Sequence, residues 1–235
     1  MFDVDELRQI YNPAYFGSEK DHYVWTEHQT NPKALATVEF LFNGGVIGYI
    51  KSGLLKEMQD AYRGDSTATL KLRTICDGVL FLDRGEEHYF VILEVKSGFG
   101  DVKKRAINQI PASYVKTKSI LNDFSSYNKG NYREFGLIVS YPYVPHANTD
   151  SENNPVVMEN KRKMIGDKNE KIVSKYSKLL QDHQSAIFLG SDFEFDNLTK
   201  VKPELFFDQL KVKHFPAANY CVNTVIDLDN VIRNL

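Results

Sequence analysis

Two carboxylates and one lysine are the residues of this sequence best placed to do chemistry together. Glu94 and Lys96 lie two positions apart at the end of an apolar run, and Asp77 precedes another apolar run. Because side chains alternate between the faces of a strand, Glu94 and Lys96 share one face if their run is a strand. Pairing of the two runs would bring Asp77 close to Glu94. Neighbouring carboxylates repel each other, so such a cluster suits a divalent metal and chemistry on phosphates.

This pattern resembles the PD-(D/E)xK nuclease superfamily, whose members share the restriction-endonuclease-like fold. Asp77, a spacer and then Glu94-Val95-Lys96 carry the resemblance, which covers roughly residues 46–142. Cys76 stands where the motif has its proline, a position that the family tolerates. The resemblance implies an α/β fold with an αβββαβ core, a mixed central sheet flanked by helices, and additions at both ends of the chain.

The resemblance also implies a function, a metal-dependent nuclease that hydrolyses phosphodiester bonds. DNA is favoured over RNA, and an endonuclease over an exonuclease. Asp77, Glu94 and Lys96 would be catalytic, and Mg²⁺ or Mn²⁺ would be bound by Asp77, Glu94 and the carbonyl of Val95. The metal would polarise the scissile phosphate and lower the pKa of a bound water, while Lys96 orients that water or stabilises negative charge. The alternative is a non-catalytic nucleic-acid-binding or protein-interaction domain on the same fold.

The tripeptide of an acid, any residue and a lysine is weak evidence by itself, because short motifs recur by chance. It occurs three times, at residues 94–96, 101–103 and 159–161. Only the first ends an apolar run and leads into a glycine and a basic helical segment. The competing interpretation is a surface Glu-Lys pair at a strand end, with Asp77 opening a turn.

The elements that must position these residues are a hairpin, a helix and a further strand. The apolar runs 78–82 and 89–93, with the polar segment 84–88 between them, predict an antiparallel hairpin. An alternating pattern over 67–75 predicts a strand before the hairpin. Residues 102–124 have a helical pattern with Pro111 as a kink or early break, and 134–142 predict the next buried strand.

Two helices are predicted before these strands, at residues 32–43 and 46–63. Each places one glutamate among apolar positions, Glu39 in the first helix and Glu57 in the second. The resemblance implies that such a helix can add a glutamate to the metal site. Glu57 is preferred, because the helix next to the sheet usually packs on it, and Glu39 is the competing candidate.

The terminal parts of the chain are less informative. Residues 1–31 predict a short helix followed by a loop, and His22 or His28 could add a metal ligand, although a lone histidine usually has another role. A basic helix over 161–183, a strand over 185–190, a helix begun by Pro203 and an apolar-alternating run over 221–232 follow the core. This C-terminal part could add strands to the sheet, bind substrate or form a homodimer.

Length and composition indicate one globular domain over residues 1–235, with a core at 32–145 and a C-terminal extension at 160–235. No window is long and apolar enough for a membrane span, and the first residues lack a signal-peptide pattern. A cytoplasmic location without a membrane partner is therefore expected. Cys76 and Cys221 are too few and too far apart for a disulfide framework or a zinc site.

The charge balance limits how nucleic acid could be bound. A net charge of −2 argues against indiscriminate coating of nucleic acid, which depends on many lysines and arginines, so contact must be local. Lys103, Lys104 and Arg105 follow the motif and would hold backbone phosphates without reading sequence. A second basic run lies within 161–178, and solvated helix faces could explain either run.

Overall fold

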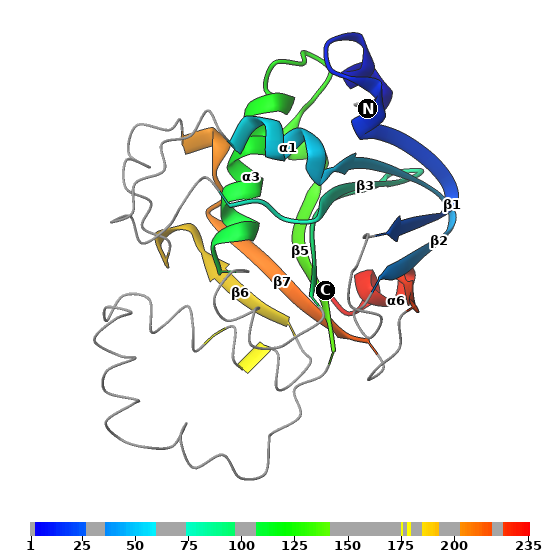
Figure 1. Ribbon diagram of the computed structural model, residues 1–235. Coiled ribbons are helices and arrows are strands. Elements are labelled where there is room, and N and C mark those ends of the chain that lie inside the picture. The colour runs from blue at the N-terminus through cyan, green and yellow to red at the C-terminus, as the bar shows by residue number, and fades with distance from the viewer. Residues whose placement is uncertain are drawn as a thin grey trace.

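The computed structural model describes the chain in several stretches, which together hold most of the predicted core. The described residues are 3–26, 36–59, 74–96, 107–141, 175, 178–179, 185–192, 203–217 and 223–235. Within these stretches, eight strands form one mixed sheet, and three α-helices with several short 3-10 turns pack around it (Figure 1). The protein is therefore of the α/β class, as predicted.

The strands follow the order β1-β2-β3-β4-β5-β7-β6 across the sheet, and β8 pairs with β2. Their bounds are β1 Phe16–Thr26, β2 Thr37–Lys51, β3 Gly78–Arg84, β4 Glu87–Lys96, β5 Arg133–Ser140, β6 Ser185–Leu189, β7 Gln209–Pro216 and β8 Asn223–Asp227. Strands β2, β3 and β4 are antiparallel neighbours, whereas β5 is parallel to β4 and β7 is parallel to β5. The chain crosses from β4 to β5 through helix α3, the kind of connection that parallel neighbours require.

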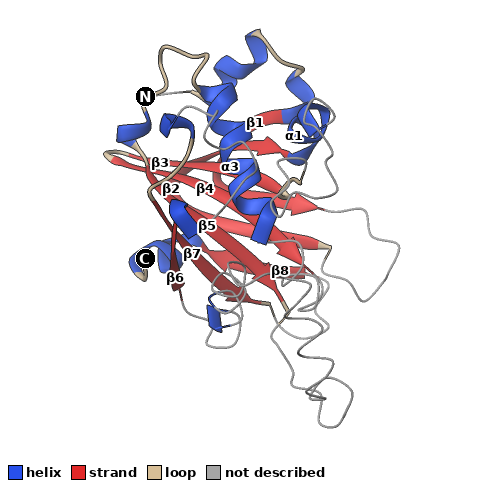
Figure 2. Ribbon diagram, turned by 90° about the vertical axis from the view of Figure 1, so that its left-hand side faces the viewer, coloured by secondary structure: helices blue, strands red, loops and turns tan. Residues whose placement is uncertain are grey.

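Helices cover both faces of the sheet (Figure 2). The α-helices are α1 Ser52–Gln59, α3 Ile107–Leu121 and α6 Leu228–Arg233, and the 3-10 turns are η1 Val4–Gln9, η2 Pro13–Tyr15, η4 Lys129–Asn131, η5 Gly190–Asp192 and η7 Pro203–Leu205. Residues of η1, α1 and α3 share one buried cluster, and residues of α6 belong to the other. Because both faces are covered, the central strands are apolar on both sides, which explains their continuous apolar runs in the sequence.

The predicted hairpin is confirmed as β3 and β4, which pair from Gly78 opposite Leu93 to Arg84 opposite Glu87. The turn is shorter than predicted and consists of Gly85 and Glu86. Gly85 has a φ of 61°, a left-handed conformation that glycine adopts without steric cost. The helix after β4 is confirmed as α3, which continues through Pro111 rather than breaking there. The strands predicted over 134–142 and 185–190 are confirmed as β5 and β6.

The helix predicted over 32–43 is wrong where the structure describes it, because residues 37–43 belong to the long strand β2. A bulge in this strand explains the difference. Gly44 has a φ of 70°, its N–H donates to the carboxylate of Asp21, and the register between β1 and β2 shifts at this point. Val38 and Phe40 before the bulge and Ile47 after it therefore face the same core although their numbers differ in parity. The core-facing residues therefore do not alternate regularly along the sequence, and the segment lacks the periodicity typical of a strand.

Other boundaries also differ from the predictions. The helix predicted over 46–63 begins only at Ser52, because β2 continues to Lys51. The predicted N-terminal loop contains β1. The strand predicted over 67–75 lies outside the described residues except for its last two positions, and β2 takes the place beside β3.

The C-terminal part of the chain adds strands to the sheet, one of the three roles considered for it. Strands β6, β7 and β8 all come from this part. The run over 221–232 forms β8 and then α6, whereas the helix predicted at Pro203 is only the short turn η7. The predicted basic helix over 161–183 lies almost entirely outside the described residues. Among the helices that are described, none is both long and apolar enough to cross a membrane.

Candidate active site

Asp77 is held at the open end of the hairpin, opposite Glu94. It directly precedes β3, and its N–H donates to the carbonyl of Leu93 at 3.0 Å. One oxygen of its carboxylate, Oδ2, accepts a hydrogen bond of 2.7 Å from the N–H of Val95. The strand pairing thus fixes both the backbone and the side chain of Asp77 at the end of β4.

Lys96 joins the two acids. Its Nζ forms an ion pair with Glu94 Oε1 and lies 3.5 Å from Asp77 Oδ2. Glu94 and Lys96 lie on the face of β4 that also carries Ile92, the face covered by α3. The three residues that the sequence predicted as a catalytic set are therefore in contact in the folded chain.

Burial differs among the three members of this cluster. Glu94 is fully buried at 0% exposure, while the side chains of Asp77 and Lys96 are 19% and 18% exposed. Burial of the ammonium group lowers the pKa of Lys96, but the negative charges of Glu94 and Asp77 and their hydrogen bonds outweigh that effect, so the pKa lies above its ordinary value. Lys96 therefore carries a positive charge at neutral pH.

Helix α3 anchors the backbone that leads to Asp77. Gln109 donates to the carbonyl of Ile75 at 2.6 Å, and the hydroxyl of Ser113 accepts from the N–H of Cys76 at 2.7 Å. Lys116 donates to the carbonyl of Thr74 at 2.7 Å. These three polar side chains recur at intervals of four and three residues, so they share one face of the helix. This role was not predicted, although polar residues at that spacing in a mostly apolar helix are a visible signal in the sequence.

Lys116 and Cys76 are both buried in this anchor. Burial lowers the pKa of Lys116 to about 8 and raises the pKa of the Cys76 thiol to about 12. The thiol donates to the carbonyl of Gly78 at 3.2 Å. Cys76 is thus a packed, protonated thiol.

A cleft opens beside Asp77, between β1 and the start of α1. Its volume is about 650 Å³, and Asp77 forms part of its wall. Trp25 of β1 lines the cleft and donates from its indole N–H to the backbone carbonyl of Asp77 at 3.4 Å. His22, a weak metal-ligand candidate in the sequence, also lines it, whereas His28 lies outside the described residues. Trp25 is not among the predicted site residues, because the sequence predicts a loop in place of β1.

A further polar pair lies along the same sheet edge. Ser140 ends β5 and is the register partner of Lys96 in the parallel pair. Its hydroxyl forms a hydrogen bond of 2.9 Å with Nε2 of His214 on β7, and both residues are buried. In open α/β sheets, ligands bind beyond the carboxyl ends of the strands, which is the edge that Lys96 and Ser140 occupy.

Glu57 and Glu39 are not placed as the sequence predicted. Glu57 lies on α1 but is exposed, and its carboxylate accepts a hydrogen bond from the hydroxyl of Tyr15. Because α1 begins at Ser52, its buried positions include Leu54 and Leu55, and Glu57 falls outside them. Glu39 is a half-buried residue of strand β2 rather than of a helix.

The donor atoms of the cluster fit a hard divalent cation only in part. Carboxylate oxygens of Asp77 and Glu94 and the carbonyl of Val95 are ligands that Mg²⁺ accepts, and Mg²⁺ usually keeps several waters. Among the described residues, no three His, Cys, Asp or Glu side chains form a group that could hold a metal. An ion here would therefore rely on two carboxylates, a backbone oxygen and water, and it would share the carboxylates with Lys96.

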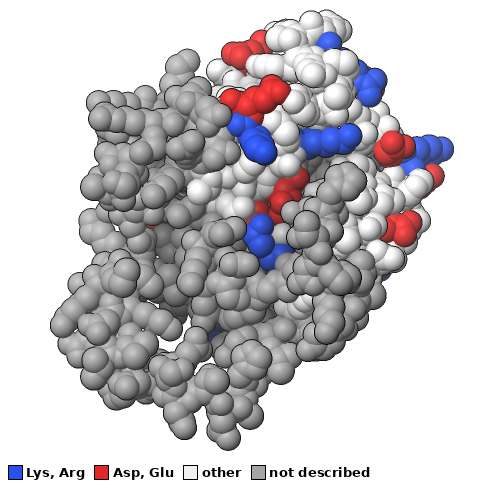
Figure 3. All heavy atoms as spheres, in the orientation of Figure 1, with Lys and Arg blue, Asp and Glu red and all other residues white. Residues whose placement is uncertain are grey.

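The predicted phosphate contacts Lys103, Lys104 and Arg105 lie outside the described residues, as does nearly all of the second basic run over 161–178. On the face shown in Figure 3, the described basic and acidic side chains form small separate groups rather than one broad basic patch.

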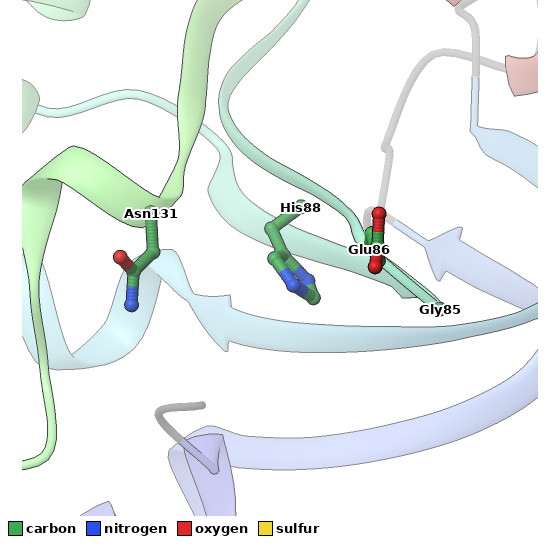
Figure 4. A pocket seen from close by; sticks show the side chains of 4 residues that line it. All are labelled: Gly85, Glu86, His88 and Asn131. Atoms are coloured by element: carbon green, nitrogen blue, oxygen red, sulfur yellow. The ribbon is translucent and has the colours of Figure 1, made fainter.

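A second pocket lies at the other end of the hairpin. It has a volume of about 360 Å³ and is lined by Gly85, Glu86, His88 and Asn131 (Figure 4). His88 Nδ1 lies 2.8 Å from Asp83 Oδ1. This pocket is at the turn that joins β3 and β4, whereas the Asp77 cluster lies at their open end, so the two sites are separate.

Comparisons with protein-family models, with curated proteins and with solved structures found no match to the chain.

Proposed function

We propose that the protein is a metal-dependent nuclease that hydrolyses phosphodiester bonds in nucleic acid, with DNA favoured as the substrate. The observation that carries the proposal is the contact of Lys96 with both Asp77 and Glu94 at the end of β4. The order of β2, β3, β4, α3 and β5, with β5 parallel to β4, supports a restriction-endonuclease-like core around this cluster.

Each residue of the cluster has a distinct role in this proposal. Asp77, Glu94 and the carbonyl of Val95 would hold Mg²⁺ or Mn²⁺, which would polarise the scissile phosphate and acidify a bound water. The Val95 N–H keeps the Asp77 carboxylate oriented, and the burial of Glu94 excludes water from its side of the site. Lys96 remains protonated at neutral pH, so it can donate to the attacking water or to a phosphate oxygen as negative charge develops.

Activity can be tested with the full chain and a panel of substrates. Supercoiled plasmid, linear duplex, single-stranded DNA and RNA would be incubated with Mg²⁺, Mn²⁺ or EDTA. We expect cleavage only with metal, and loss of at least about 100-fold in Asp77→Asn and in Lys96→Ala. Glu87→Gln is the matched control, because Glu87 is an exposed acid at the other end of β4. Cleavage that persists in EDTA, or in Asp77→Asn, would contradict the proposal.

A non-catalytic binding domain is the competing function, and one observation favours it. Lys96 already neutralises part of the negative charge of Asp77 and Glu94, so the cluster is stable without a metal. Binding of nucleic acid without cleavage in any metal would support this alternative. Calorimetric titration with Mn²⁺ distinguishes the two, because the nuclease should give a saturable heat change on metal binding and Asp77→Asn should not.

A further inference from the structure

The cleft beside Asp77 has features that hydrolysis at the acid cluster does not require. Four aromatic side chains line it, those of Tyr15, Tyr23, Trp25 and Tyr49. Its volume of about 650 Å³ is in the range of sites for small organic ligands, which are usually aromatic-lined with a few polar groups. Tyr15 and Tyr49 are half-buried, so part of each side chain remains open to a ligand.

Two glycines make room for these tyrosines. A Cβ atom at Gly53 would lie 2.5 Å from Cε1 of Tyr15, and a Cβ atom at Gly17 would lie 2.6 Å from Cζ of Tyr49. Tyr49 also stacks on Tyr23, with ring centroids 4.4 Å apart. The backbone and the neighbouring ring thus hold the two open tyrosines in defined positions, as a rigid stacking surface requires.

Polar groups lie at the margin of this aromatic surface. His22 and Lys51 are exposed residues of the cleft, and Nζ of Lys51 lies 5.7 Å from the centroid of the Tyr49 ring. Either side chain can donate a hydrogen bond to a base edge or to a phosphate. Trp25 connects the cleft to the acid cluster through its hydrogen bond to the carbonyl of Asp77.

We propose that this cleft binds an unpaired nucleotide, with its base against Tyr15 and Tyr49 and its phosphate directed toward Asp77. The inference rests on the proposed nuclease function and specifies its substrate as nucleic acid with a single-stranded segment. A double helix is far wider than a cleft of this size, whereas one unstacked base fits it. Stacking on tyrosine tolerates any base, so the cleft selects for single-stranded structure rather than for sequence.

The intrinsic fluorescence of Trp25 can report on binding in the cleft, because Trp25 lines it and is the only tryptophan of the chain. Its fluorescence would be titrated in EDTA, where cleavage is not expected, with a single-stranded oligonucleotide and with a relaxed, covalently closed duplex circle that contains the same sequence. We expect the single strand to change the fluorescence with saturation, and the closed duplex to bind at least about tenfold more weakly.

Variants of the two open tyrosines test the stacking contact. Tyr15→Leu and Tyr49→Leu should each weaken single-strand binding by about 5- to 100-fold, and Tyr15→Phe and Tyr49→Phe should restore it, because phenylalanine keeps the ring. Tyr11→Leu is the matched control, since Tyr11 is also half-buried but packs on Phe16 and Phe124 rather than in the cleft. Circular dichroism would establish that each variant is folded, and either tyrosine alone suffices for the test.

The results separate this inference from the nuclease proposal. Equal affinity for the closed duplex, or leucine variants that bind as tightly as Tyr11→Leu, would overturn the inference even if the wild-type protein cleaves duplex DNA. Single-strand binding that depends on Tyr15 and Tyr49, without cleavage in Mg²⁺ or Mn²⁺, would support the cleft and overturn the nuclease.

Discussion

The carboxylate of Asp77 accepts a hydrogen bond from the backbone N–H of Val95, so the end of one strand orients the acid that precedes its neighbour. Because of this contact, two roles of Asp77 can be tested separately: accepting the hydrogen bond in the fold and supplying a carboxylate for catalysis. Asp77→Asn keeps an oxygen acceptor for the N–H, whereas Asp77→Ala removes it. We expect both variants to lose turnover and the ion pair with Lys96, but Asp77→Ala to lose about 1–3 kcal/mol more unfolding free energy than Asp77→Asn in urea denaturation. Equal stability of the two variants would show that the hydrogen bond contributes little.

Lys96 should contribute stability that depends on pH. Because its pKa is raised in the folded state, its ion pairs stabilise fully below its ordinary pKa of 10.5, and this contribution is lost as pH rises through the folded-state pKa. We expect Lys96→Met to be about 3 kcal/mol less stable at pH 7, because Glu94 is left buried without its cation. The deficit should shrink above pH 10.5, and the double variant Lys96→Met/Glu94→Gln should recover much of it. Urea denaturation at several pH values measures this, and a deficit that Glu94→Gln does not relieve would contradict it.

Lys116 should have the opposite pH dependence. Its pKa is lowered to about 8 in the folded state, so between about pH 8 and 10.5 the unfolded chain binds more protons and stability rises with pH. We expect the wild-type protein to gain about 2–3 kcal/mol relative to Lys116→Met as pH rises from 7 to 10. Thermal unfolding of the two proteins in parallel would measure this difference. If the stability difference between the two proteins stayed constant from pH 7 to pH 10, Lys116 would be either neutral or fully solvated over that range.

The basic run after the motif should supply electrostatic contacts to phosphates. Replacing Lys103, Lys104 and Arg105 with alanine should weaken binding about equally for unrelated sequences and reduce the salt slope by up to about 3 units, near one for each lost contact. The comparison protein carries three lysine-to-alanine changes within the run over 161–178. Fluorescence anisotropy at several salt concentrations gives the salt slope of each variant. A larger loss of affinity and of salt slope in the comparison protein would show that the binding surface lies in the run over 161–178.

The two helix-glutamate candidates should be dispensable for turnover. Glu57 is exposed and bonded to Tyr15, and Glu39 is a half-buried residue of β2. We expect Glu57→Gln and Glu39→Gln each to retain cleavage within about twofold of wild type, since among the described residues no third acidic side chain forms a metal-binding group with Asp77 and Glu94. Steady-state cleavage assays at limiting Mg²⁺ would reveal any loss of metal affinity. A slow Glu57→Gln protein would assign that residue to the metal site after all.

The hairpin and its cluster could be predicted from the sequence because the decisive signals are local. Two apolar runs, a glycine at the turn and the alternation of Glu94 and Lys96 are sufficient to bring Asp77 and Lys96 together. Strand β2 could not be predicted in the same way, because the bulge at Gly44 changes which residues face the core. A pattern that changes phase within one strand resembles neither regular period.

The surroundings of the cluster depend on contacts between distant segments. Ser113 and Lys116 bind the backbone before Asp77 only because α3 packs beneath that segment. Trp25 reaches the carbonyl of Asp77 from a strand far away in the sequence. The spacing of polar residues on α3 is visible in the sequence, but the backbone atoms that they bind are set by the tertiary structure.

The pairing of β8 with the first half of β2 has a consequence for how the chain folds during synthesis. Thr37 to Leu41 hydrogen-bond in parallel with Asn223 to Asp227, and Arg84 forms an ion pair with Asp229. A nascent chain that has emerged only as far as β7 would therefore expose an unpaired edge on β2, which is prone to association with other chains. Contacts so far apart in sequence also slow folding, because the loop between them must close first. Until β8 is available, this edge of β2 is therefore open to pairing with another chain.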